Sequence, residues 1–136
     1  MKREWFAVLG VGLLVAFGAG TALFGTSFWA DPIRAIQGLL LIAGGVVFVW
    51  GGRGEERYGL EPIRLIGLGN VALGVVVILN GVSTLLGGIP SESAALTAAL
   101  AASAGGFALA FIGGGLYRGG DAIDIELSDE PILGGD

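Results

Sequence analysis

The sequence predicts an all-α membrane protein in which four transmembrane helices form an up-down bundle. Of the 136 residues, 54% are hydrophobic and only 14% are charged, and the mean hydropathy is +0.82. The apolar residues gather in four continuous runs, each close to the roughly 20 residues that a helix needs to cross a bilayer core. None of the runs shows the period-two alternation of a membrane β-barrel strand. One transmembrane domain over residues 1–118 is therefore expected.

The first two spans are expected at residues 5–24 and 33–50. The first follows Lys2 and Arg3, as a signal peptide would, but its apolar run exceeds the usual 7 to 15 residues of such a peptide. A retained helix is therefore the better prediction. The second span follows Asp31, a good N-cap residue, and Pro32, which suits the first position of a helix.

The last two spans are expected at residues 63–87 and 93–117. Glu61 and Pro62 precede the third span in the same way as Asp31 and Pro32 precede the second, although Glu is a poorer N-cap. Pro90 interrupts the chain between the third and fourth spans.

The basic residues predict the orientation of these spans. Arg34 alone would lie on one side of the membrane, whereas the other six basic residues would share the opposite side: Lys2, Arg3, Arg53, Arg57, Arg64 and Arg118. Because Lys and Arg are enriched in cytoplasmic loops, both termini are expected in the cytoplasm of a multi-pass plasma-membrane protein. Aromatic residues that favour the headgroup level lie near the expected span ends: Trp5, Trp29, Trp50, Tyr58 and Tyr117.

A repeated phrase opens the second and third spans. DPIRAI (31–36) resembles EPIRLI (61–66), and residues 31–51 share eight identities with residues 61–81. Since consecutive spans run in opposite directions, the two copies would lie at opposite surfaces and would not form one site. Arg34 and Arg64 are expected to be interface anchors, each paired with the acid three residues earlier. The alternative for Arg34 is a role in binding an ion or a lipid headgroup.

Small residues predict where helices pack closely. Such residues let helix backbones approach each other in a membrane, where the hydrophobic effect provides no drive. Residues seven apart lie on nearly the same helix face, and this spacing gives two seams, Gly44 with Gly51 and Gly74 with Gly81. The fourth span carries a ladder with a step of four: Ala98, Ala102, Gly106, Ala110 and Gly114. These surfaces are expected to pack either within one bundle or between protomers.

Catalytic chemistry is not expected. The chain has no Cys and no His, which removes thiolate nucleophiles, imidazole bases and the usual zinc ligands. Small four-span multidrug exporters have a similar size and span count, but their membrane-embedded Glu is missing, since Glu4 lies at the edge of the first span. No cofactor or metal site is expected, because Arg residues are well placed to neutralise Glu55, Glu56 and Glu61.

Besides several Ser and Thr, three residues with side-chain amides lie inside the spans: Gln37, Asn70 and Asn80. They are expected to form hydrogen bonds between helices; the alternative is that they line a narrow polar path in an oligomer. Residues 67–72 match the dinucleotide fingerprint GxGxxA, but no strand precedes them, so the match is accidental.

The tail, residues 119–136, carries six acids and no base, which argues against a nucleic-acid partner. A disordered cytoplasmic tail is expected. The alternative rests on Ile123, Ile125 and Leu127, which alternate with polar residues as in a strand that pairs with a cytoplasmic partner.

The acidic tail, the single Lys and the Gly-rich apolar body resemble, in style of composition, small multi-span membrane proteins of halophilic archaea. This resemblance implies a plasma membrane in a high-salt cell and implies no activity. The function expected is that of a non-enzymatic accessory or structural subunit, with lipids and either copies of itself or another membrane protein as partners. A small oligomeric channel or transporter is the alternative.

Overall fold

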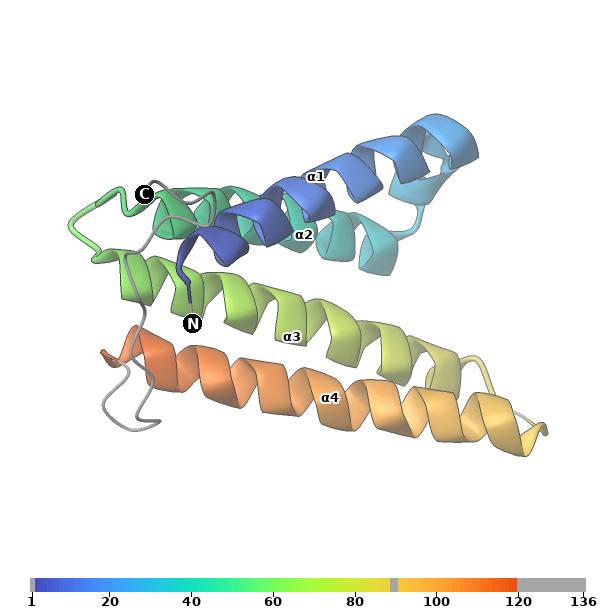
Figure 1. Cartoon of the computed structure of the whole chain (residues 1–136). Coiled ribbons are helices and arrows are strands. Elements are labelled where there is room, and N and C mark those ends of the chain that lie inside the picture. Colours follow the sequence, from blue (N-terminus) through green and yellow to red (C-terminus); the bar gives the residue numbers. More distant parts are fainter. Residues whose placement is uncertain (1, 89–90, 120–136) are drawn as a thin grey trace.

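The computed structural model describes residues 2–88 and 91–119, apart from the side chain of Phe28. Within this part of the chain lie four long helices, α1 (Glu4–Phe24), α2 (Pro32–Arg53), α3 (Pro62–Leu86) and α4 (Ser93–Tyr117), as Figure 1 shows. A short 3-10 helix, η1 (Thr26–Ala30), joins α1 to α2. All four helices are long and apolar enough to cross a membrane. The predicted all-helical fold with four candidate spans is confirmed.

The helix ends agree with the prediction within one residue, except that α2 continues to Arg53 instead of ending at residue 50. The two glycines at 51 and 52 stay helical, and Gly54 ends the helix by adopting a left-handed φ of 74°. Its N–H donates to the carbonyl of Gly51, the usual hydrogen bonding of a glycine C-cap. The acidic residues and the alternating segment of the predicted tail lie outside the described residues.

The two similar helix starts differ in their caps. The Asp31 side chain accepts hydrogen bonds from the backbone N–H groups of Ile33 (2.9 Å) and Arg34 (3.4 Å). Glu61 caps α3 through its backbone alone, without a side-chain hydrogen bond. The prediction that Glu61 is the poorer cap is confirmed.

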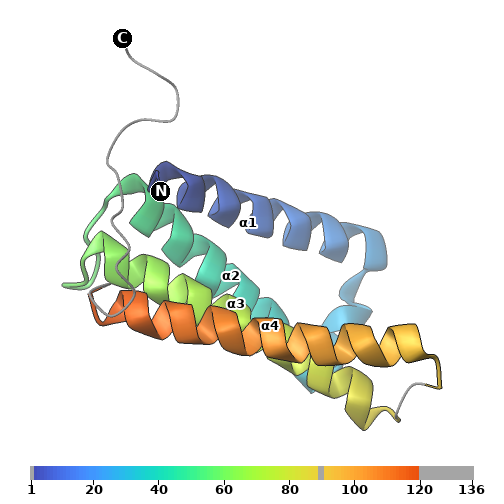
Figure 2. The ribbon, with the colours of Figure 1, turned by 60° about the horizontal axis from the view of Figure 1, so that its bottom comes forward.

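The four helices run alternately up and down and pack in the order of the chain. The extensive contacts are between α1 and α2, α2 and α3, and α3 and α4. Among the described residues α1 and α4 form no extensive contact, and Figure 1 shows them at opposite edges of the row. In Figure 2, α4 crosses in front of α3, and α1 lies apart from both. The helix ends at Phe24, Pro32, Leu86 and Ser93 are called the Arg34 end, and those at Glu4, Arg53, Pro62 and Tyr117 the Arg64 end.

The buried core lies toward the Arg64 end. Phe48 of α2, Ile66 of α3 and Leu116 of α4 form a fully buried cluster, and Phe6 of α1 packs against it. The rings of Phe6 and Phe48 are stacked with their centroids 5.9 Å apart. All four helices are therefore tied together at this end of the molecule.

The longest close contact joins α3 to α4. A Cβ atom added to Gly67 would lie 2.6 Å from the carbonyl oxygen of Gly113, and one added to Gly74 would lie 2.6 Å from that of Gly106. A Cβ atom added to Gly81 would lie 2.8 Å from the carbonyl oxygen of Ala99. In both antiparallel helices, the residues at this close contact are thus spaced by seven. Each step of seven residues rotates the contact position by only about 20° around the helix, so the seam stays on a single face. No side chain larger than hydrogen fits at these glycines without displacing the backbone.

Candidate functional site

The Arg34 end holds a polar cavity between the start of α2 and the end of α3. Its volume is about 380 Å³. The polar residues that line it come from both helices: Asp31, Arg34, Gln37, Asn80, Ser83 and Thr84. The hydroxyl groups of Ser83 and Thr84 donate to carbonyls of their own helix, at Leu79 (2.6 Å) and Asn80 (3.0 Å). Their lone pairs remain as acceptors toward the cavity.

Gln37 and Asn80 meet in this cavity, one from each helix. Neither side-chain amide has a hydrogen-bond partner among residues 2–88 and 91–119. Each amide has two N–H donors and a carbonyl acceptor. The cavity therefore offers hydrogen-bond donors as well as acceptors to a small polar group.

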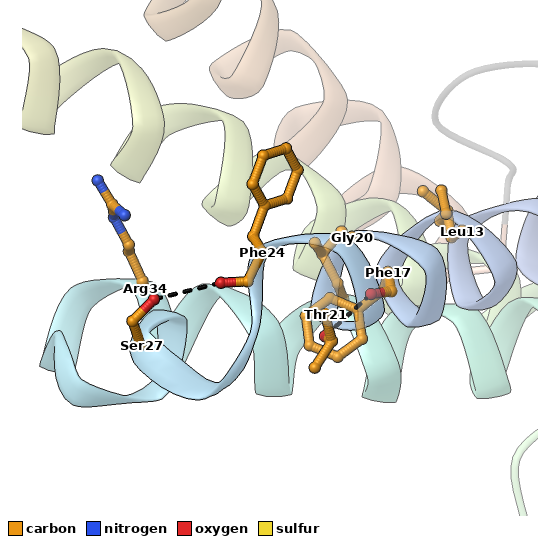
Figure 3. A pocket seen from close by; sticks show the side chains of 9 residues that line it. Leu13, Phe17, Gly20, Thr21, Phe24, Ser27 and Arg34 are labelled. Atoms are coloured by element: carbon orange, nitrogen blue, oxygen red, sulfur yellow. Dashed lines mark hydrogen bonds between the residues drawn. The ribbon is translucent and has the colours of Figure 1, made fainter.

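An apolar groove of about 530 Å³ opens beside it, between α1 and α2 (Figure 3). Most of its lining is hydrocarbon or backbone: Leu13, Ala16, Phe17, Gly20, Phe24 and Leu41. The hydroxyls of Thr21 and Ser27 donate to the carbonyls of Phe17 (3.0 Å) and Phe24 (3.3 Å). Since those donors already have partners within the chain, the groove presents a mainly apolar surface.

Arg34 belongs to the lining of both the cavity and the groove. Its Nε lies 3.7 Å from Oδ2 of Asp31, and its side chain is 63% exposed. Figure 3 shows its guanidinium extending to the same side as the ring of Phe24. The ion pair engages one of the three guanidinium nitrogens, so the terminal NH₂ groups keep their four N–H donors.

Arg64 occupies the corresponding position at the other end without such surroundings. Its Nε lies 3.8 Å from Oε2 of Glu61, so the predicted pairing of each Arg with the preceding acid is present in both copies of the phrase. Arg64 lines neither the polar cavity nor the apolar groove. The two arginines are alike in sequence and local pairing, and they differ in what lies beside them.

Asn70 is not part of the polar cavity. It is 8% exposed, its amide donates to the carbonyl of Ile66 at 3.1 Å, and its Cβ faces Gly113 on α4. The three predicted polar residues are therefore divided, with Gln37 and Asn80 together and Asn70 in the seam between α3 and α4. The sequence holds a signal for this division. Asn70 and Asn80 are ten residues apart in one helix, which separates them by about 15 Å along the helix axis.

The predicted seam residues of α2 and α3 all lie at helix contacts. A Cβ added to Gly44 would meet Ala72 at 3.2 Å, and one added to Gly51 would meet the Pro62 carbonyl at 2.9 Å. Gly74 and Gly81 lie against α4 as described above. Sequence reasoning missed Gly10 and Gly45, which meet each other between α1 and α2.

The ladder on α4 is divided between different faces. Gly106 and Ala110 face Gly74, whereas Ala98 is exposed and nothing lies within 4 Å of a Cβ added to Gly114. A step of four residues turns the helix by about 40°, so the five positions span about 160° of its circumference. The carbonyl groups that lie closest to the glycines of α3 belong to Ala99, Gly106 and Gly113. These residues are spaced by seven, and a search for that spacing would find them in the sequence.

In the loop between α2 and α3, two arginines flank one carboxylate. Glu55 contacts Arg57 (2.9 Å) and Arg53 (3.6 Å), and the Arg57 guanidinium lies 5.6 Å from the centre of the Trp50 ring. A carboxylate held by two guanidinium groups is a poor ligand for a metal ion, because both cations compete for its oxygens.

No curated protein and no solved structure matches the chain. Residues 1–129 match the model of a family of unknown function, DUF7994. This match covers all four helices and both features of the Arg34 end. The chain belongs to the DUF7994 family.

Proposed function

We propose that the protein is a non-enzymatic integral membrane protein that acts by packing against another membrane helix, either from a second copy of itself or from a partner subunit. The observation that carries this proposal is a stripe of small residues on α4. Opposite the seam with α3, this stripe comprises Ala94, Ala98, Ala101, Gly105 and Ala108, all of them exposed. We call these five residues the outer stripe.

The outer stripe follows helical geometry, since its spacings of three and four keep it on one face. In lipid such a face contributes little by itself, because small side chains bury little surface against acyl chains. Against another helix it permits close backbone approach, which is the usual role of small residues in membrane interfaces. The seam between α3 and α4 is an example within the same molecule, and it supports assigning the outer stripe to a contact of the same kind.

The charge distribution supports a particular orientation for this assembly. We propose that the Arg64 end faces the cytoplasm of a plasma membrane, because Lys2, Arg3, Arg53, Arg57 and Arg118 all lie near it together with Arg64 itself. Arg34 would then be the single basic residue at the outer surface.

Cysteine crosslinking in native membranes tests the helix-packing proposal. The chain contains no Cys, so Ala101→Cys introduces a single thiol in the outer stripe. If the partner is a second copy, oxidation gives a disulfide-linked dimer; if the partner is another protein, a bifunctional thiol–amine reagent gives one discrete heavier adduct. Leu39→Cys, at an exposed position on α2, is the matched control and should stay monomeric. Equal crosslinking at both positions, or none at Ala101→Cys with either reagent, would contradict the proposal.

One observation favours the second candidate, a small oligomeric channel or transporter: the unpaired amides of Gln37 and Asn80 share the polar cavity. Flux of small solutes into liposomes tests it. If the cavity belongs to a conduction path, Asn80→Leu should abolish flux whereas Asn70→Leu, in the seam between α3 and α4, should preserve it. Absence of flux in the unaltered protein would exclude this candidate.

A further inference from the structure

The polar cavity and the apolar groove lie on either side of one cationic side chain. Arg34 lines both spaces, at the end of the helices where a membrane protein meets the headgroup layer. A ligand that fills both spaces must combine an anionic, hydrogen-bonding group with a hydrocarbon chain. A phospholipid has this construction.

We propose that the Arg34 end is a phospholipid-binding site in which Arg34 holds the lipid phosphate and the groove between α1 and α2 holds one acyl chain. The terminal guanidinium nitrogens of Arg34 offer a forked set of donors, which suits the oxygens of a phosphate. The amides of Gln37 and Asn80 donate to the remaining phosphate oxygens or to the glycerol part of the lipid. The acyl chain lies along Leu13, Phe17 and Phe24.

Among residues 2–88 and 91–119, Asp31 is the one acidic residue that lines this cavity. Its Oδ1 accepts from two backbone N–H groups of α2, and its Oδ2 faces Nε of Arg34. Both oxygens are thus directed at donors of the protein, and Asp31 fixes the guanidinium while leaving its outer edge open. The start of α2 is capped by Asp31 itself, so the cation that attracts the phosphate is Arg34 and not the helix end.

The apolar lining of the groove supports an acyl chain as its occupant. An acyl chain that enters the groove from the bilayer gains no hydrophobic transfer energy, because lipid already surrounds it. The groove therefore positions the lipid, and the preference for one lipid over another comes from Arg34. Lipid selectivity should accordingly depend on the phosphate and on this one cation.

Native mass spectrometry of the full chain, purified from nanodiscs, tests the site. The nanodiscs contain equal amounts of phosphatidylglycerol and monogalactosyl diacylglycerol with the same acyl chains, so that the phosphate is the main difference. The unaltered protein should retain phosphatidylglycerol preferentially. Arg34→Gln should reduce this preference about fivefold, as expected for one basic residue near a membrane surface. Arg64→Gln, which loses an equivalent ion pair, should leave the preference unchanged.

A second pair of variants tests the groove without changing any charge. Nothing lies within 4 Å of a Cβ added to Gly20 or to Gly18, so at either position a side chain can leave the helix without a clash at its Cβ. Gly20 lines the groove and Gly18 does not. Gly20→Phe should therefore lower retention of phosphatidylglycerol, and Gly18→Phe should not.

Three results would overturn the proposal. One is an equal loss of preference in Arg34→Gln and Arg64→Gln, which would indicate general attraction between basic residues and lipid. Another is full retention in Gly20→Phe, which would leave the groove without a role. The third is displacement of the lipid by soluble glycerol phosphate, which would identify a site for a free phosphate ester.

Discussion

The hairpin of α3 and α4 and the pair of α1 and α2 have similar compositions and pack very differently. In the hairpin, close contacts run from Gly67 near the Arg64 end to Gly81 near the Arg34 end. In the pair, the close contacts involve Gly10, Gly45 and Gly52, all in the half nearer the Arg64 end. Toward the Arg34 end the two helices separate and the apolar groove lies between them.

The difference lies in where the glycines fall around each helix. On α3, Gly67, Gly74 and Gly81 recur at every seventh residue on the face toward α4, and Gly69 contacts Phe48 of α2. On α1 only Gly10 meets another helix. Space for a side chain remains at Gly12, Gly18 and Gly20. The number of glycines therefore does not predict close packing; their phase around the helix does.

The largest expected effect is a loss of stability when Gly106 of α4 is changed, with the neighbouring Gly105 as the control. A Cβ at Gly106 would lie 2.7 Å from the Gly74 carbonyl oxygen, whereas at Gly105 it meets nothing within 4 Å. Gly106→Ala should lower the free energy of unfolding by about 1–3 kcal/mol, because the backbones must separate. Gly105→Ala should be neutral or stabilising by up to about 1 kcal/mol, because Ala is the better helix former.

Reversible unfolding of the monomer in mixed detergent micelles, where the outer stripe has no partner helix, gives both values. Similar effects in the two variants would show that the seam between α3 and α4 does not distinguish adjacent positions, and the comparison between hairpin and pair would fail. A stabilising effect at Gly105 alone would sharpen the comparison. It would show that Ala improves helix stability where no helix is in contact, and that the loss at Gly106 comes from the contact with α3.

A smaller effect is expected in α1. A Cβ at Gly10 would lie 2.5 Å from the Gly45 carbonyl oxygen, whereas Gly12 has open space. Because α1 packs extensively only on α2 among the long helices, it can tilt away and relieve the clash. Gly10→Ala should therefore cost about 1 kcal/mol, at the low end of the range for overpacking.

Hydrogen exchange resolved by segment distinguishes this local loosening from general unfolding. Exchange should rise in residues 4–24 of Gly10→Ala and stay unchanged in α3 and α4, with Gly12→Ala as the control. An equal rise in all four helices would show that the molecule opens as one unit and that the pair is no less firmly packed than the hairpin.

The sequence predicts the helices well because their determinants are local. Apolar runs fix the spans, and Asp31, Pro32 and Pro62 mark starts that the structure reproduces. The pairing of Arg34 with Asp31 and of Arg64 with Glu61 is also local, since three residues separate the partners. These features depend on neighbours in the chain and can be predicted before any tertiary contact is known.

The candidate site depends on register between helices, which one sequence does not display directly. Gln37 and Asn80 come together because antiparallel α2 and α3 place the fifth residue after Pro32 at nearly the same depth as the sixth residue before Leu86. The groove depends on α1 diverging from α2, for which no single residue gives a sign. Of the site, the sequence indicates Arg34 as a possible lipid contact, but it does not indicate the cavity and the groove on either side of this residue.

The smallest effect expected concerns the two copies of the repeated phrase. The Asp31 side chain caps α2 and Glu61 forms no side-chain cap on α3. Removing a good cap typically costs about 1 kcal/mol, whereas a surface substitution away from such features stays within about 0.5 kcal/mol. Asp31→Ala should therefore destabilise the protein measurably in the same unfolding assay, and Glu61→Ala should not.

Asp31→Asn separates the cap from the ion pair, since Asn caps helices as well as Asp does but carries no charge toward Arg34. Exposed ion pairs contribute little, about 0–1 kcal/mol, so this variant should keep nearly all of the stability that Asp31→Ala loses. A loss as large as that of the Ala variant would instead make the pair with Arg34 the main contribution of Asp31. The two copies of the phrase would then stabilise their helices in the same way, and the difference between them would lie only in the cavity and groove beside Arg34.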